Sequence, residues 1–404
     1  MTRPGTAPAG NYTFDDWYKE SSFTTKWNFA TDTVTANTTL YARWTSTITY
    51  NANTATGTVP ASQTATAGLS VTLPQETALK KRGYVLGGWS TTTGGAAVSS
   101  SYAPLGNTTL YAVWTKAANV YTEAGLGADP TLDAQFTWLE ENALSATEYT
   151  VEANADQNIT ARTLFYSGYN NVTINLKGRT STRTISKTGS TSMLTVGSGV
   201  TLILDNYITL KGNISNVALV TVDSGGKLEM NSGSTITDNT NGSAVASGTR
   251  NGGGVYVAGT FVMKPGTAAI TGNSVRSKEL TIGGAVNAHG GGVCVASTGV
   301  FTMEGGTISG NTTSATSSGN CHSRGAGVYV AAGGTFTKTG GTITGYATGN
   351  NSSLNTTIIN NVFGGGEGHA VFLVASGGFS ARYRDTTAET GVNLDSSTID
   401  NWGQ

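Results

Sequence analysis

The sequence predicts an all-β protein that ends in a right-handed parallel β-helix. Glycine makes up 55 of the 404 residues, about twice the usual share of about 7%. Charged residues make up only 12%. Valine, isoleucine, phenylalanine and tyrosine nevertheless recur at regular intervals between glycines and asparagines. β-Branched and aromatic residues favour strands, whereas Gly and Asn favour turns. The composition therefore indicates many short strands and tight turns.

One sequence unit recurs through the C-terminal half. Gly252-Gly-Gly-Val-Tyr-Val257 returns as Gly290-Gly-Gly-Val-Cys-Val295 and as Gly325-Ala-Gly-Val-Tyr-Val330. A Phe-containing segment and a Thr-Ile-Ser-Gly-Asn-like segment follow each copy, and two plainer copies precede them. Corresponding valines are 26, 35, 38 and 35 residues apart, at Val196, Val222, Val257, Val295 and Val330. Each unit is therefore a set of short strands followed by a loop of variable length.

Stacking is the arrangement that such units require. A single unit exposes both strand edges and cannot bury its apolar face, but stacked units close the edges and build a continuous core. The strands then lie about 4.8 Å apart from coil to coil, with the usual right-handed connection. The variable loops gather on one side, which in solenoids often forms the binding face; they span residues 240–251, 274–289, 312–324 and 347–367.

Residues 117–190 carry the signals of a cap for the first coil. Asp129-Pro130 predicts a helix start with proline at the first helical position. Leu132, Phe136 and Leu139 would share one helical face. Strands are expected at 150–153, 163–166 and 172–176. Such a cap would cover apolar core and unpaired strand edges at the N-terminal end.

A second repeat family occupies residues 12–115. Tyr12-Thr-Phe-Asp-Asp-Trp17 corresponds to Tyr84-Val-Leu-Gly-Gly-Trp89, and Asn37-Thr-Thr-Leu-Tyr-Ala-Arg-Trp-Thr45 corresponds to Asn107-Thr-Thr-Leu-Tyr-Ala-Val-Trp-Thr115. In a strand, Leu40, Ala42 and Trp44 point to one side. We expect the repeated tryptophans to form small cores; stacking platforms for a sugar are the alternative.

These motifs resemble the Listeria–Bacteroides repeat, also called the internalin B-repeat, over about 105 residues. The resemblance implies small β-grasp-like modules in tandem in bacterial surface proteins, and no enzyme activity. The first copy lacks the opening strand that Ile48-Thr-Tyr50 supplies in the second, so we expect the parent protein to extend further towards the N-terminus. The C-terminal units resemble the β-helix repeats of large bacterial surface and autotransported proteins.

Four segments follow from these repeats. Residues 1–45 are the C-terminal part of a truncated B-repeat, and residues 46–116 form a B-repeat. Residues 117–190 form the helix-bearing cap and first coils, and residues 191–404 form the β-helix with a C-terminal cap.

Candidate binding residues follow from the strand alternation. If Val255 and Val257 point into the core, then Tyr256, Cys294, Tyr329 and Phe372 stand outside in one row. Exposed aromatics can bind sugars or a partner surface, although we favour their being covered by the variable loops. The candidate contacts are those loops together with side chains in and just before these strands, namely Tyr256, Tyr329, His289, His322 and His369.

The two cysteines leave several readings open. Cys294 and Cys321 are close in register, and a His/Cys cluster can hold zinc. However, the spacing is irregular and no Cys-x-x-Cys pair exists, so no metal or cofactor is expected. A Cys294–Cys321 disulfide would fit an oxidising compartment, and two unpaired thiols are the alternative. A column of asparagines, Asn213, Asn239, Asn273 and Asn311, predicts a hydrogen-bonded ladder at a turn.

No catalytic residues are assigned. Successive coils carry Asp205, Asn231, Lys264, Glu304 and Thr339 after the Phe-containing strand, which gives no carboxylate pair of the kind that glycoside hydrolysis uses. The net charge of −1 and the lack of a long apolar run make nucleic acid and membrane insertion poor expectations. We expect a non-enzymatic extracellular adhesin or scaffold at the bacterial surface that binds a glycan or a surface protein. The alternatives are a polysaccharide-active enzyme and a structural stalk.

Overall fold

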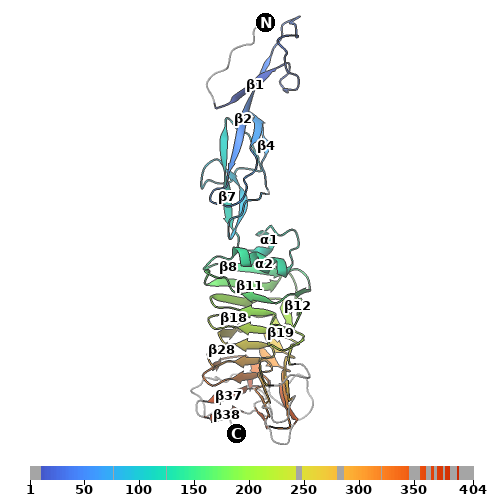
Figure 1. Ribbon diagram of the computed structural model, residues 1–404, viewed down its shortest axis with the longest axis vertical. Helices are drawn as coiled ribbons and strands as arrows, with labels where there is room; N and C mark the ends of the chain where they lie inside the picture. Colours follow the sequence, from blue (N-terminus) through green and yellow to red (C-terminus); the bar gives the residue numbers. More distant parts are fainter. Residues whose placement is uncertain are drawn as a thin grey trace. The chain divides into compact units, whose positions relative to one another are not determined.

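The computed structural model describes residues 11–75, 77–123, 125–242, 248–279, 286–319, 321–344, 355–360, 365–367, 371–375, 378–382 and 389–390. The chain divides into two compact units, Met1–Ala117 and Ala118–Gln404 (Figure 1). Their regular elements in the described residues are strands apart from two helices, so the all-β prediction is confirmed.

The first unit contains one five-stranded sheet. The order is β1 (Thr13–Tyr18), β2 (Tyr41–Asn51), β7 (Thr108–Lys116) and β5 (Tyr84–Ser90), with β3 (Gln63–Thr66) also on β2. A small pair, β4 (Val71–Thr72) and β6 (Ser101–Tyr102), completes the unit. β1 pairs with β2 as β5 pairs with β7, antiparallel and with a register shift at the same place in each pair. The two sequence copies therefore fold alike.

The core of the second copy contains the residues that the alternation predicted. Leu110 and Ala112 are fully buried beside Trp89, which is also inaccessible to solvent. The indole nitrogen of Trp89 donates a hydrogen bond to the carbonyl oxygen of Pro74 at 2.7 Å. Its apolar ring and its polar N–H are thus both satisfied inside the module. This tryptophan is a core residue and not a platform for a sugar.

The second unit is a parallel β-helix, as predicted. Three sheets run along it, and each coil gives one strand to each sheet (Figure 1). The first sheet contains β8 (Glu148–Ala153), β11 (Val172–Gly178), β14 (Val200–Leu204), β18 (Lys227–Met230), β23 (Thr260–Met263), β28 (Val300–Met303) and β33 (Thr335–Lys338). The second contains β9 (Gln157–Ile159), β12 (Arg183–Lys187), β15 (Ile208–Lys211), β19 (Ser234–Thr237), β24 (Ala269–Thr271), β29 (Thr307–Ser309) and β34 (Thr342–Ile343), with β39 (Glu389–Thr390) antiparallel at the end.

The third sheet carries the repeated valines. It contains β10 (Arg162–Leu164), β13 (Leu194–Val196), β17 (Val220–Val222), β22 (Val255–Val257), β27 (Val293–Val295), β32 (Val328–Val330) and β37 (Val371–Ala375), closed by antiparallel β38 (Gly378–Arg382). Val220, Val255, Val293 and Val328 are aligned in register from coil to coil. All four side chains are fully buried. The sequence spacing therefore identified the inward positions correctly.

Aromatic rings stack inside the helix at one inward position. The rings of Phe261 and Phe301 lie 4.5 Å apart and nearly parallel, and Phe336 continues the stack at 4.9 Å from Phe301. Parallel in-register strands place identical side chains directly above one another, which explains why the same residue suits successive coils.

The asparagine ladder is confirmed for Asn239, Asn273 and Asn311. Asn213 does not join it, because its amide donates instead to the carbonyl oxygens of Lys187 and Gly189. The backbone N–H of Asn273 donates to Oδ1 of Asn311 at 3.0 Å, and that of Asn311 donates to Oδ1 of Asn355 at 2.9 Å. Each side-chain amide also donates to an isoleucine carbonyl one coil back; Asn311 uses Ile270 at 3.0 Å. Asn355 is a member that the sequence did not reveal, because its coil has an irregular spacing.

The cap begins later than predicted. Helix α2 spans Leu132–Asn142, and its N-cap is Thr131, whose side chain accepts from the N–H of Ala134. Asp129 instead accepts from the hydroxyl of Tyr121 at 2.8 Å, so Pro130 precedes the cap and is not the first helical residue. A four-residue helix α1 (Val120–Glu123) lies before it. The predicted apolar face holds, because Leu132, Phe136 and Leu139 are buried in the β-helix core.

Arg162 ties this helix to the first coil. Its guanidinium contacts the carboxylates of Asp133 and Glu140 at 3.0 Å each, and its side chain is 16% exposed. We expect Arg162→Met to lower the free energy of unfolding by about 1.5–3 kcal/mol, the usual loss for hydrogen bonds to charged groups. Urea denaturation and amide hydrogen exchange in α2 would measure the loss. The exposed Arg276→Met is the control, and an equal effect of both substitutions would contradict this role.

Where the structure describes them, the segments expected to be variable loops contain strands, which corrects the prediction. They form two further parallel sheets. One contains β16 (Ile214–Ser215), β20 (Thr240–Asn241), β25 (Ser274–Lys278), β30 (Thr312–Thr316) and β35 (Thr356–Asn360). The other contains β21 (Thr249–Asn251), β26 (Val286–His289), β31 (Cys321–Arg324) and β36 (Gly365–Glu367). We call these the fourth and fifth sheets.

A small core of their own holds these two sheets together. Val275, Val286, Ala288, Ala315 and Cys321 form a separate buried cluster. The segments pair because stacking of the coils brings each one to strand distance from the corresponding segment of the next coil. The predicted gathering on one side therefore takes the form of an ordered lobe.

Candidate binding site

The predicted outer row exists, and the fifth sheet covers most of it. Register aligns Tyr256, Cys294, Tyr329 and Phe372 on the outside of the third sheet. Together they form an apolar cluster distinct from the main core. Cys294, Tyr329 and Phe372 are 2%, 8% and 0% exposed, whereas Tyr256 is half-buried. The row is thus accessible only at its N-terminal end.

Parallel rings hold the covered part of this row. The ring of His289, from the fifth sheet, lies 4.1 Å from the ring of Tyr329 at an angle of 3°. Tyr329 in turn lies 5.7 Å from Phe372 at 1°, and the guanidinium of Arg324 lies 4.9 Å from the Phe372 ring. Stacking of this kind fastens the fifth sheet to the helix.

The three histidines differ in burial and in whether the structure describes them. His289 is buried, and its Nδ1 lies 3.1 Å from Oδ1 of Asn251. His322, on β31, is half-buried and is paired in register with Asn287. His369 lies outside the described residues. The structure therefore brings together His289 and Tyr329, which face each other inside the lobe.

The cysteines belong to different clusters. Cys294 lies in the outer row and Cys321 in the core between the fourth and fifth sheets. No disulfide joins them in the part of the chain that the structure describes. Burial raises the pKa of the Cys294 thiol, which keeps this sulfur protonated and unreactive. The disulfide remains a prediction that this structure does not support.

Burial of His289 makes the lobe sensitive to acid. Desolvation, followed by the nearby charges of Arg324 and His322, lowers the pKa of His289 from 6.5 to about 3. The unfolded chain therefore takes up a proton near pH 6.5, whereas the folded chain does not until about pH 3. Stability is thus full above pH 6.5 and is lost as the pH falls towards 3, by about 1.4 kcal/mol per pH unit.

Urea denaturation between pH 7 and pH 4 would test this expectation. His289→Phe keeps a ring against Tyr329 but cannot take up a proton, so the loss on acidification should shrink. Equal pH dependence in the two proteins would show that other groups control acid stability.

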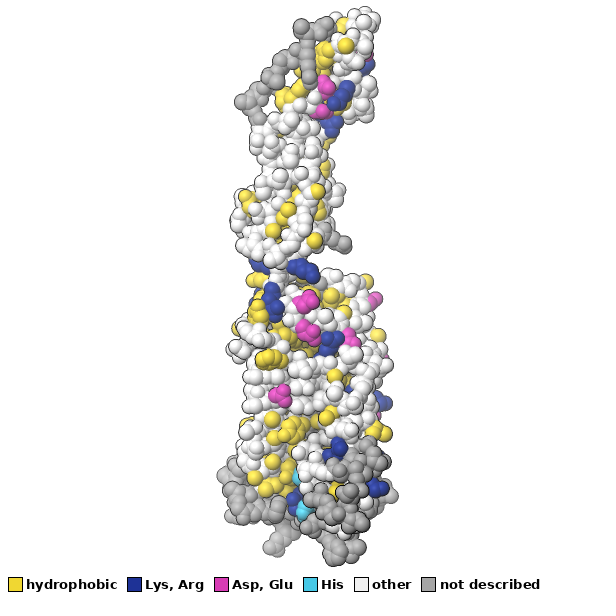
Figure 2. Space-filling view, in the orientation of Figure 1, with side chains coloured by type: hydrophobic (Ala, Val, Ile, Leu, Met, Phe, Trp, Pro, Cys, Tyr) yellow, Lys and Arg dark blue, Asp and Glu magenta, His cyan; other side chains and the backbone are white. Residues whose placement is uncertain are grey.

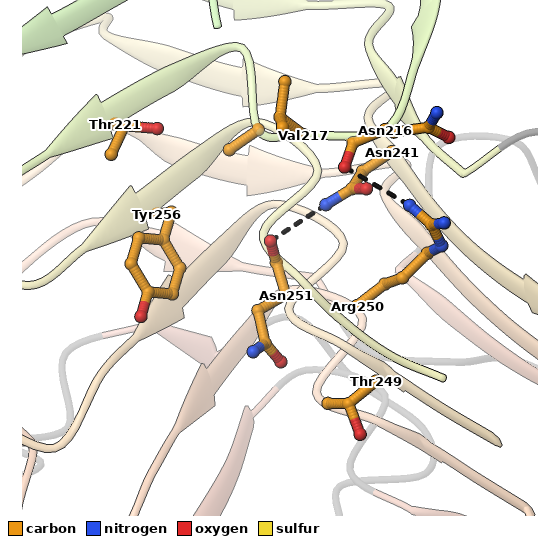
Figure 3. Close-up of a pocket in the computed structure, with 9 residues that line it drawn as sticks. Asn216, Val217, Thr221, Asn241, Thr249, Arg250, Asn251 and Tyr256 are labelled. Carbon is orange, nitrogen blue, oxygen red and sulfur yellow. Dashed lines mark hydrogen bonds between the residues drawn. The ribbon is translucent and has the colours of Figure 1, made fainter. Parts of the chain in front are cut away.

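A hollow of about 280 Å³ opens at the accessible end of the row. It lies where β21, the first strand of the fifth sheet, has no strand from the preceding coil to pair with. The preceding coil contributes only the connection at residues 216–218 and Thr221. Figure 3 shows the Tyr256 ring on one side of the hollow and Arg250 and Asn251 on the other. The hollow thus lies at the coil where the lobe begins, because the coil before it supplies no strand for β21.

The lining is polar and carries one cation. Seven of its nine residues have amide, hydroxyl or guanidinium side chains: Asn216, Asn241, Asn251, Thr221, Thr249, Tyr256 and Arg250. Arg250 donates through Nη1 to the carbonyl oxygen of Asn216 at 3.2 Å. Its Nε has no acceptor among the described residues, and burial lowers the pKa of the guanidinium. A partly desolvated donor of this kind binds an acceptor more strongly than a fully hydrated one.

Sequence reasoning named Tyr256, but it included Arg250 and Asn241 only as part of the loop at residues 240–251. Register does offer a signal, because the outer row reads Thr163, Thr195 and Thr221 before it changes to Tyr256. That change from hydroxyl to aromatic marks the coil where the covering sheet begins.

Two acidic residues that follow the Phe-containing strand are paired with side-chain amides or an amine. Asp205 accepts from the side-chain amides of Asn175 and Asn231, each at 3.3 Å. Glu304 pairs with Lys264 at 3.3 Å. Within the described ranges no three His, Cys, Asp or Glu side chains cluster as metal ligands would. No helix in these ranges is long and apolar enough to cross a membrane.

Comparison with known proteins bears on the N-terminal unit. Residues 1–43 and 47–113 match the Listeria-Bacteroides repeat domain. The chain is also 38% identical over 125 residues to Internalin H of Listeria monocytogenes serovar 1/2a, which covers 30% of this chain and 22% of that protein. No solved structure matches the chain. These similarities indicate a surface or secreted bacterial protein, and its N-terminal unit consists of Listeria–Bacteroides repeats of the internalin type.

Proposed function

We propose that the chain is a non-enzymatic bacterial surface adhesin whose repeat modules act as spacers and whose β-helix binds a surface component. The observation that carries this proposal is the ordered lobe of the fourth and fifth sheets. A stalk needs only the three main sheets for its core, whereas the lobe adds a second core and a polar hollow on one side of the solenoid. Insertions on one face of a solenoid commonly serve binding.

The surface chemistry supports binding of uncharged polar groups. Figure 2 shows few charged side chains on the visible face of the β-helix. Hydroxyl and amide groups dominate the lining of the hollow. Such groups form hydrogen bonds with glycans and with protein backbones without a large electrostatic field.

One experiment separates the three functions that the sequence left open. The purified chain is incubated with immobilised polysaccharides and glycoproteins, and retained protein and released sugar ends are recorded together. An adhesin is retained without release. Release of sugar ends would overturn the non-enzymatic proposal, and the absence of both signals would favour a stalk.

A further inference from the structure

We propose that the hollow at Tyr256 is a binding subsite for a single pyranose unit of a glycan. The inference rests on the proposed adhesin function and names the site at which the adhesin would contact its ligand. Three observations carry it: the partly open aromatic ring, the donors and acceptors around it, and the state of the neighbouring strand edge.

Tyr256 is the one member of the aromatic row that is left half-open. Its row neighbours one and two coils further on are covered by His289 and by the fifth sheet. On the N-terminal side its neighbour is Thr221, which has no ring. The aromatic part of the outer row thus ends at Tyr256, beside a space of about 280 Å³. A pyranose presents a flat C–H face of the kind that packs on a tyrosine ring, with its hydroxyls at the edge.

Hydrogen-bonding groups surround the ring at the places where those hydroxyls would lie. Arg250 stands opposite Tyr256 (Figure 3) and uses Nη1 for Asn216, while its Nε has no acceptor in the described part of the chain. Nδ1 of His289 contacts Oδ1 of the Asn251 amide, and this contact fixes the direction in which Nδ2 of Asn251 points. These donors are positioned before any ligand arrives, which lowers the entropic cost of binding.

The edge of β21 argues against a polypeptide strand as the occupant. Addition of a strand requires unpaired backbone groups along the edge. Here Nδ2 of Asn241 donates to the carbonyl oxygens of Asn251 and Gly252, each at 2.9 Å. The edge is therefore already capped by a buried side chain. A compact ligand that uses side-chain donors fits the site better than an extended chain.

A glycan array with the full chain identifies a bound sugar, and titration of that sugar tests the site. We expect Tyr256→Ala to weaken binding about tenfold or more, equivalent to about 1.4 kcal/mol. Arg250→Gln should weaken it as well, and more for a uronate-bearing sugar than for its neutral counterpart, because the lining holds one cation and no carboxylate.

Tyr207→Asn is the matched control. Tyr207 is a tyrosine of the same β-helix that is 50% exposed and lies outside the hollow. Its φ of +64° is one that asparagine tolerates, so this variant should bind as the natural chain does. Circular dichroism checks that every variant is folded.

The outcomes distinguish the subsite from the function. Sugar binding that survives Tyr256→Ala and Arg250→Gln would overturn the subsite and leave the adhesin proposal standing. Retention on a protein in place of a glycan would do the same. An array and a protein panel without any retention would overturn both.

Discussion

Replacing Asn311 with alanine is expected to lower the free energy of unfolding of the β-helix by about 3–5 kcal/mol. The side chain is fully buried. Its Oδ1 accepts from the backbone N–H of Asn273 at 3.0 Å, and its Nδ2 donates to Ile270 and to Asn355, each at 3.0 Å. Alanine would remove the acceptor of the Asn273 N–H and the side-chain donor of the Ile270 carbonyl, whereas Oδ1 of Asn355 would keep the backbone N–H of Asn311. Each buried polar group left without a partner costs about 1–3 kcal/mol.

Urea denaturation followed by far-UV circular dichroism would measure this loss. Asn287→Ala is the matched control, because the Asn287 amide makes one exposed hydrogen bond, to Thr249 at 2.9 Å. We expect that substitution to change stability by about 0.5 kcal/mol or less. If both variants lost the same stability, the ladder would contribute no more than a surface amide does.

Phe301→Ala is expected to cost a similar amount, about 3–5 kcal/mol. The ring is fully buried and lies between Phe261 and Phe336, in contact with both coils. Removing it leaves a cavity in the middle of a stack, and neighbouring rings held by parallel strands can collapse into it only in part.

The adjacent Val300→Ala serves as the control, since Val300 is 38% exposed and faces outward. Amide hydrogen exchange would show where the β-helix opens. We expect faster exchange in the coils of β23, β28 and β33, with the N-terminal repeat unit unchanged. Exchange that rose equally in the repeat unit would contradict the division into two compact units.

The three main sheets of the β-helix could be predicted because their contacts repeat from each coil to the next. Each coil touches only the coils before and after it, so residues such as Val255, Val293 and Val328 must recur wherever the strand recurs. The same argument found the asparagine column and the outer row that contains Tyr256. The cap helix was found from its apolar face, but its start was misplaced because both Asp129 and Thr131 can serve as an N-cap.

The lobe and the hollow could not be predicted in this way. The fourth and fifth sheets arise from segments of unequal length, and their pairing depends on coils that are already stacked. The hollow depends on what the preceding coil lacks, because residues 216–218 supply no partner for β21. A sequence pattern records the residues that are present in each coil, and it carries no direct sign of a missing strand.

The asparagine ladder also bears on how such a chain can change its length over evolution. Asn273 and Asn311 each accept from the coil before and donate to an isoleucine carbonyl of that coil. A tandem duplication of one coil would therefore insert a copy whose upper and lower faces already match its neighbours. Before β21, where coils stack through the in-register strands of the main sheets, a duplication would lengthen the plain solenoid and leave the lobe and its hollow unaltered. The length of the β-helix and its proposed binding site can thus change independently during evolution.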